Sequence, residues 1–191
     1  MTISVIGLNH KSANIDVREK FSFSADNASL LLRRIKKTKD ISEVIVVSTC
    51  NRTEIYCDSN NGVSDIKDWL LAEREYESFG KYLYIHQEED AIEHLFKVVA
   101  GLDSMVIGET EVLGQVKTAY KIALENKSID GKLKRLFEYS FSVAKNVRTN
   151  TDIGGNAISF MYTSILLIKK IFSSVEEKKC LLIGAGEMTE L

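Results

Sequence analysis

The segment Val44–Cys57 reads VIVVSTCNRTEIYC and decides how the first part of the chain folds. Its apolar beginning is typical of a buried strand, and Glu54–Cys57 predicts a second strand, with Thr49–Arg52 as the link between them. A cysteine at the end of a strand is held by a rigid backbone. An extended chain would also place the side chain of Arg52 on the same side as that of Cys50.

The proximity of Cys50 and Arg52 suggests covalent chemistry on an acidic substrate. A nearby cation favours the thiolate, which is the nucleophilic form of cysteine. A guanidinium can also hold a carboxylate through two hydrogen bonds. The alternative is a small buried cysteine beside a surface arginine, because free cysteines are often core residues. The local sequence leaves both interpretations open.

The segments around this hairpin predict a small mixed domain. Strand patterns occupy Ile3–Leu8 and Tyr82–Ile85, and apolar residues at helical spacing predict helices over 26–37 and 64–75. The resulting order βαββαβ indicates an α+β fold with a ferredoxin-like sheet and helices on one face.

From Glu88 onward the pattern is helical. It predicts added helices over 90–100, 109–125 and 132–148. Between the first two lies the loop 101–108, which is too apolar for an ordinary surface turn and is bounded by glycines. Long ordered loops of this kind are often functional, and Ser104, Glu109 and Gln115 offer hydrogen bonds to a polar substrate.

A domain boundary is predicted near residue 150, giving a first domain over 1–150 and the start of a second over 151–191. In the second part, a helix over 158–172 is followed by a strand over 180–183 and the turn Gly184–Met188. This is the opening unit of a Rossmann-type α/β domain. A single strand of that kind has no sheet to join, so we expect the chain to be a fragment of a longer protein.

The glycine turn predicts dinucleotide binding. Gly184 and Gly186 allow backbone N–H groups to approach a pyrophosphate at a helix N-terminus. Thr189 stands where the third glycine of the fingerprint would be, and the residue that reads the ribose would lie beyond Leu191. The turn therefore does not separate NAD from NADP, and an ordinary glycine turn is the alternative.

The composition narrows the class of protein. The net charge of -2 excludes the overall basic field of a general nucleic-acid binder, so an RNA partner needs a local patch. On a later helix, Lys134, Lys145 and Arg148 form such a candidate for phosphate contacts, although Glu138 on the same side weakens it. Three cysteines without a CxxC pair, no signal peptide and no long apolar run predict a cytoplasmic protein away from the membrane. The histidines and cysteines show no metal-ligand spacing.

Five blocks, in order along the whole chain, resemble the glutamyl-tRNA reductase family: Gly7–Ala13, Ser48–Tyr56, the segment 101–117, Val147–Thr149 with Thr151, and Gly184–Met188. The resemblance implies NADPH-dependent reduction of glutamyl-tRNA(Glu) to glutamate-1-semialdehyde, the first step toward 5-aminolevulinate and tetrapyrroles. It places the nucleophile at Cys50, whose thioester would accept hydride from NADPH. Covalent capture of this kind divides one difficult step into two easier ones.

The resemblance also assigns roles to individual residues. His94, which by itself is most often structural at the margin of a helix face, matches a histidine that the family needs for activity. The residues implied in substrate binding are Thr49, Asn51, Arg52, Ser104, Glu109, Thr110, Glu111 and Gln115, and those implied in cofactor binding are Gly184, Ala185, Gly186, Glu187, Met188 and Thr189. Glu111 departs from the family, which usually has glutamine there. A carboxylate would repel an acidic substrate unless it faces the substrate's amino group or points away.

For the whole protein the resemblance implies a homodimer, formed through a C-terminal domain that is absent here, and hand-over of the product to glutamate-1-semialdehyde aminomutase. We expect residues 1–191 alone to lack tight NADPH binding and hydride transfer. One rival is a non-catalytic RNA-binding module with an RRM-like sheet, which would need exposed aromatic residues on its central strands. Another rival is a thiol dehydrogenase of the aldehyde type, in which the nucleophile follows the dinucleotide fold rather than preceding it.

Overall fold

The computed structural model describes residues 2–37, 40–73, 79–153 and 160–172, together with residues 174, 178, 179 and 181. Of the predicted strand over 180–183 only residue 181 is described, and the predicted cofactor residues, Gly184 to Thr189, lie outside the described residues.

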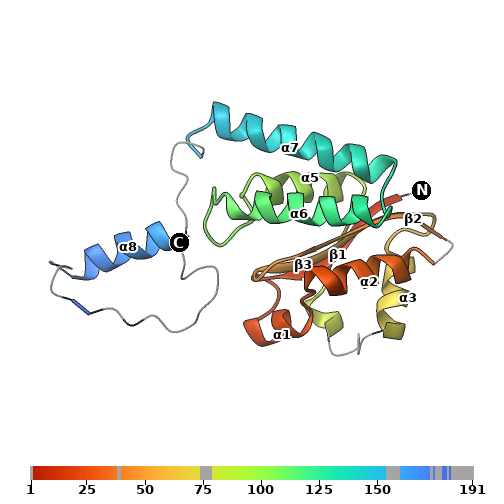
Figure 1. The fold of residues 1–191 in the computed structure, drawn as a ribbon, viewed down its shortest axis with the longest axis horizontal. Coiled ribbons are helices and arrows are strands. Elements are labelled where there is room, and N and C mark those ends of the chain that lie inside the picture. The colour runs from red at the N-terminus through yellow and green to blue at the C-terminus, as the bar shows by residue number, and fades with distance from the viewer. Residues whose placement is uncertain are drawn as a thin grey trace.

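A four-stranded antiparallel sheet forms the centre of the fold (Figure 1). Its strands are β1 (Thr2–Asn9), β2 (Ile41–Ser48), β3 (Arg52–Ser59) and β4 (Tyr84–Gln87), in the spatial order β2-β3-β1-β4. The predicted hairpin is confirmed, because β2 and β3 pair antiparallel from Ser48↔Thr53 outward. Arg52 belongs to β3 rather than to the link, so only residues 49–51 connect the two strands.

Helices cover both faces of the sheet (Figure 1). On one side are α2 and α3, and on the other are α5, α6 and α7, so every residue of β3 is buried. The prediction of helices on one face therefore holds only for the βαββαβ unit, because the added helices cover the opposite face. The helices are α1 (Ile15–Lys20), α2 (Ala25–Ile35), α3 (Val63–Glu73), α5 (Glu89–Val99), α6 (Glu111–Glu125), α7 (Lys132–Asn150) and α8 (Phe160–Ile171).

Helix α1 was not expected from the pattern, because six residues are too few to show a helical period. Its N-cap is Asn14, whose side chain accepts a hydrogen bond from the backbone N–H of Val17. Strand β4 also begins later than predicted, at Tyr84, because Gly80–Tyr82 form a 3-10 turn. Of these two differences, α1 bears on the candidate site, since Arg18 on this helix donates a hydrogen bond to the carbonyl of Cys50.

A carboxylate on β2 fixes the beginning of α7. Glu43 accepts hydrogen bonds from the backbone N–H groups of Asp130 and Gly131 at 2.6 Å, and from that of Leu133 at 2.9 Å. Burial alone would raise the pKa of Glu43, but these N–H groups outweigh it and the pKa is lowered. The carboxylate thus anchors α7 to the edge of the sheet.

The face of α7 that packs on β3 completes the core on this side of the sheet. The ring of Phe137 meets that of Tyr56 edge to face, with the ring centroids 5.3 Å apart, and both side chains are fully buried. Within the part of the chain that the structure describes, no helix is both long and apolar enough to cross a membrane.

Candidate active site

The predicted site residues gather at one end of the sheet. The turn between β2 and β3, helix α1, the loop after α5 and the last turns of α7 all lie at this end (Figure 1). A pocket there is lined by Thr49, Cys50, Asn51, Arg52, Ser104, Glu109, Glu111, Val112 and Gln115. The structure therefore brings together the residues assigned to catalysis and substrate binding, with the exception of His94 and Thr110.

Hydrogen bonds hold the turn that carries Cys50. The hydroxyl of Thr49 accepts from the backbone N–H groups of Asn51 and Arg52, each at 3.1 Å. The carbonyl of Cys50 accepts from Arg18 Nε at 3.2 Å, and the carbonyl of Asn51 accepts from the His10 N–H at 2.9 Å. Thr49 therefore shapes the turn through its hydroxyl. The side chain of Cys50 is exposed on this braced backbone.

The charges around Cys50 differ from the expectation. Burial raises the pKa of the thiol, and the carboxylates of Glu109 and Glu111 raise it further. The cation that opposes them is Arg18, on α1, rather than Arg52. These charges disfavour the thiolate in the free chain, and the cation nearest to the thiol is Arg18 where Arg52 was expected.

Arg52 is buried and fully engaged in ion pairs. Its side chain is 1% exposed, and Nη1 donates to Glu54 Oε1 at 2.7 Å. Both Nη atoms also lie 3.1 Å from Asp103 Oδ2, and Nη2 donates to the Asp103 carbonyl. Burial would lower the pKa of Arg52, but Glu54 offsets this and the pKa is raised. A guanidinium committed to two carboxylates does not present a fork to a third.

Glu54 is the centre of the buried cluster. Its Oε1 accepts from Tyr84 at 2.5 Å and lies 2.9 Å from His94 Nε2, and its Oε2 accepts from Tyr56 at 2.7 Å. Burial alone would raise the pKa of Glu54, but Arg52, His94 and Tyr84 hold it far below its ordinary value. The carboxylate is fully buried and has partners for both oxygens, so it stays ionised.

His94 belongs to this cluster rather than to the pocket beside Cys50. An ionised Glu54 can only accept, so His94 carries its proton on Nε2 and donates it to the carboxylate. The imidazole stacks on that of His86, with the ring centroids 4.9 Å apart. The geometry therefore supports the structural interpretation of His94, as a partner that orients Glu54.

Asp103 connects the cluster around Glu54 to the N-terminal block Gly7–Ala13. Its Oδ1 pairs with Lys11 Nζ at 2.5 Å, and its Oδ2 accepts from Asn9 Nδ2 at 3.4 Å. Burial would raise the pKa of Asp103, but the hydrogen bond from Lys11 and the charge of Arg52 lower it. Sequence reasoning missed Asp103, and also the role of Arg18. Asp103 lies within the block 101–117 that resembles the family, whereas Arg18 lies outside all five blocks, and no pattern in the sequence pointed to it.

The loop after α5 has the shaped backbone that its two glycines suggested. Gly101 and Gly108 have φ values of +77° and +86°, and the Gly108 N–H donates to the Gly101 carbonyl at 3.0 Å. The loop presents Ser104 to the pocket. The hydroxyl of Ser104 is buried and has no hydrogen-bond partner among the described residues, so a substrate atom can satisfy it.

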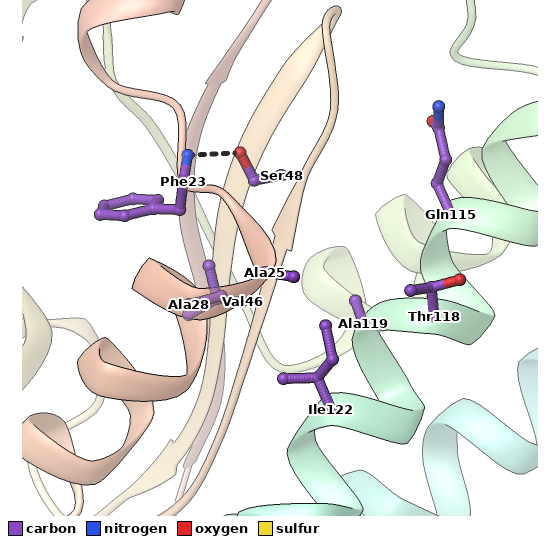
Figure 2. A pocket seen from close by; sticks show the side chains of 9 residues that line it. All are labelled: Phe23, Ala25, Ala28, Val46, Ser48, Gln115, Thr118, Ala119 and Ile122. Carbon is purple, nitrogen blue, oxygen red and sulfur yellow. Dashed lines mark hydrogen bonds between the residues drawn. The ribbon is translucent and has the colours of Figure 1, made fainter. Parts of the chain in front are cut away.

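The pocket itself is narrow, with about 20 Å³ of free space, which is the scale of a single water molecule. Two larger grooves adjoin it. One, of about 380 Å³, runs along α1 and includes Cys50, Thr49 and Arg18. The other, of about 270 Å³, lies between α2 and α6 and shares Gln115 with the pocket (Figure 2). Cys50 can therefore be approached from the α1 groove without passing through the narrow pocket.

Glu109 and Glu111, on either side of Thr110 where α6 begins, line a different pocket from Thr110. Glu109 and Glu111 line the pocket with Cys50, so Glu111 does not point away from the site. Thr110 lines a different pocket, between α6 and α7. Among the described residues, no group of three or more histidine, cysteine or acidic side chains is placed to hold a metal ion.

Comparison with known proteins identifies the family to which the chain is similar. Residues 6–151 match the family model "Glutamyl-tRNAGlu reductase, N-terminal domain". Glutamyl-tRNA reductases of Aliivibrio fischeri and Photobacterium profundum are each 45% identical over the whole chain, which spans 47% and 46% of their respective lengths. The chain therefore covers about half of these relatives.

A solved structure, glutamyl-tRNA reductase from Methanopyrus kandleri, matches with a TM-score of 0.66 and 29% identity, over 97% of this chain and 44% of that one. The family model covers most of the chain, including the second half of β1, the hairpin with Cys50 and the loop with Ser104. The chain belongs to the glutamyl-tRNA reductase family of oxidoreductases.

Proposed function

We propose that this chain performs the acyl-transfer half of glutamyl-tRNA reduction, in which Cys50 takes the glutamyl group from glutamyl-tRNA(Glu). The observation that carries the proposal is the exposed thiol of Cys50, held on a braced turn at the rim of a polar pocket. A nucleophile on rigid backbone keeps its direction of attack, which is a large part of what an active site contributes.

The charges that line the pocket suit the α-ammonium of a glutamyl group at its rim, since the free space inside is only about 20 Å³. Glu109 and Glu111 raise the pKa of Cys50 in the free chain, and a cation placed between them and the sulfur would cancel that effect. The substrate would then activate its own nucleophile on binding. The γ-carboxylate would be held by neutral donors, of which the Ser104 hydroxyl and the Gln115 amide line the pocket.

The covalent step balances without any further reagent. The Cys50 thiolate forms a bond to the acyl carbon, the ester C–O bond breaks, and the terminal hydroxyl of the tRNA leaves with the proton that the thiol gave up. The thioester that results is less stabilised by resonance than the ester, so it accepts hydride more readily. NADPH, when bound, would supply that hydride and release glutamate-1-semialdehyde, but its predicted residues, Gly184 to Thr189, lie outside the described residues.

Arg52 and His94 act in this proposal as positioning residues. Arg52 ties the end of the hairpin to Asp103 in the loop that carries Ser104, and His94 holds the carboxylate that neutralises Arg52. Both sides of the pocket are thus connected through one buried cluster. A change in His94 would reach Cys50 by displacing Glu54 and Arg52 rather than by removing a proton carrier.

The finer fold assignment also belongs to this proposal. The antiparallel order β2-β3-β1-β4, with helices after β1 and after β3, supports a ferredoxin-like catalytic domain over residues 1–150. The start of a Rossmann-type domain over 151–191, a cytoplasmic location, a homodimer and hand-over of the product to an aminomutase remain predictions for the whole protein.

An RNA-binding module with an RRM-like sheet is a poor alternative. Its central strands would need exposed aromatic rings for bases to stack on. In β1 and β3, which are described in full, the one aromatic side chain is Tyr56, and it is buried against Phe137. Both faces of the sheet are also covered by helices (Figure 1).

Mass spectrometry of the intact chain after mixing with glutamyl-tRNA tests the proposal directly. We expect a mass increase of one glutamyl group, which is absent in Cys50→Ala and retained in Cys57→Ser. The second variant is a matched control, because Cys57 is buried and burial raises the pKa of its thiol to about 12. A glutamyl group that remains on the chain in Cys50→Ala would contradict the assignment.

A further inference from the structure

A second pocket, of about 450 Å³, lies between α6 and α7 on the other side of the loop that borders Cys50. Three cationic side chains line it: Lys117 from α6, and Lys145 and Arg148 from α7. Two hydroxyl groups, those of Thr110 and Thr149, are also present, and none of the described residues that line the pocket is acidic. The pocket is therefore a concentrated positive site on a chain whose net charge is -2.

This pocket shares a wall with the site of Cys50. Gly108 and Thr110 line the basic pocket, whereas Glu109 and Glu111 line the pocket of Cys50. Arg148 crosses between them, since its Nη2 donates to the carbonyl of Glu109 at 2.9 Å. The two pockets are thus separated by one short stretch of backbone, on the order of 10 Å or less.

The basic pocket also has donor capacity that the described residues leave unused. The Nε atom of Arg148 is buried and has no hydrogen-bond partner among them. Glu138, which weakened the sequence argument for phosphate contacts on α7, is occupied by the hydroxyl of Tyr120 at 2.7 Å. It does not line the pocket, and neither does Lys134. The structure therefore replaces the predicted set with Lys117, Lys145 and Arg148.

We propose that this basic pocket binds phosphate groups of the 3′-terminal strand of the aminoacylated RNA, next to the ester that Cys50 attacks. The inference rests on the proposed function, because that function places the terminal nucleotide at Cys50. The phosphodiesters that precede this nucleotide must then lie close to the site, and the basic pocket is a neighbouring cavity whose described lining is cationic and holds no carboxylate. Lysine and arginine contacts of this kind position an RNA without reading its sequence.

Binding of uncharged tRNA, followed by fluorescence anisotropy over a series of salt concentrations, tests the pocket. For single strands, each phosphate contact contributes about 0.7 to the slope of log affinity against log salt. We expect Lys145→Gln and Lys117→Gln each to weaken binding about fivefold at low salt and to reduce the slope by about that amount. Lys134→Gln on α7 and Lys121→Gln on α6 are matched controls that remove the same charge outside the pocket.

The outcomes separate this inference from the proposed function. Loss of tRNA affinity in the two pocket variants and not in the two controls supports the inference, whether or not Cys50 becomes acylated. Equal loss in all four variants, or none in any, overturns it, even if Cys50 is acylated normally. A parallel NADPH titration distinguishes the other source of phosphate, since a pocket variant that loses NADPH affinity and keeps tRNA affinity assigns the pocket to a dinucleotide.

Discussion

The β2–β3 hairpin holds two candidate site residues, Cys50 and Arg52, in opposite environments. Cys50 is exposed at the turn, and the partial burial of its sulfur and two nearby carboxylates raise the pKa of its thiol. Arg52, two residues later, is 1% exposed and bound to Glu54 and Asp103. The site therefore combines a buried arginine, whose charge is neutralised by two carboxylates, with an exposed thiol whose pKa depends on the charges around it. Changes in the interior should therefore affect stability, and changes around the thiol should affect reactivity.

The largest effect should follow from breaking the interior. Arg52→Ala leaves the buried Glu54 with its hydrogen bonds from Tyr56, Tyr84 and His94 but without the guanidinium, and the loss of one partner of a buried ion pair costs about 3–5 kcal/mol of unfolding free energy. Urea denaturation followed by circular dichroism measures this. Lys97→Ala is the control, because it breaks the exposed pair with Glu93 at 2.6 Å and should leave the midpoint unchanged. A small loss of unfolding free energy in Arg52→Ala would show that water reaches the charged cluster around Glu54.

Variants of His94 test whether this residue positions Glu54 or transfers a proton. His94→Phe removes a hydrogen bond to a buried carboxylate and should cost about 1–3 kcal/mol, together with about tenfold in the rate of Cys50 acylation. His94→Gln retains an N–H donor and should recover most of both. If His94→Gln is as slow as His94→Phe while its stability is normal, the histidine carries a proton and is not merely a positioning residue.

The pH dependence of stability should report Glu54. The pKa of Glu54 is lower in the folded state than in the unfolded state, so the unfolded state binds more protons in acid. The stability that Glu54 contributes above its unfolded pKa is therefore lost as the pH falls toward its folded pKa. One such group adds up to about 1.4 kcal/mol per pH unit to the slope below about pH 4.3. Glu54→Gln should have a shallower slope in urea titrations between about pH 3 and 5. An unchanged slope would mean that Glu54 does not titrate in this way.

The smallest effect should appear at the thiol. Glu109→Gln removes a charge that raises the pKa of Cys50, so more thiolate forms and the rate of alkylation by iodoacetamide at about pH 8 should rise a few-fold. Arg18→Gln removes a charge that lowers the pKa of Cys50, and should slow the reaction. Cys50→Ser is the control for the site of labelling. Parallel changes in both variants would show that loop geometry, rather than charge, sets the rate.

The sequence predicted much of the fold and of the site because their signals are local. Period-2 and helical patterns located the hairpin, β1 and the long helices, and the glycines of the loop Gly101–Gly108 indicated its shaped backbone. Most of the residues predicted for catalysis and substrate binding meet around Cys50, whereas the predicted cofactor residues lie outside the described residues. The exceptions are instructive, since His94 turns toward Glu54 and Thr110 toward the basic pocket. The spacing of apolar residues predicts which face of a helix is buried, but it does not predict which residues pack against that face.

By itself, the sequence determined that a cysteine stands on a tight turn between two strands, followed by an arginine and an acidic residue, because strand and turn preferences act over a few residues. Only the tertiary structure decided which charges these groups meet. Arg52 pairs with Asp103, 51 positions away, and the cation beside the thiol is Arg18, 32 positions before it. The physical reason is that Coulomb forces and burial depend on distance in space, and the packing of the helices on the sheet sets those distances.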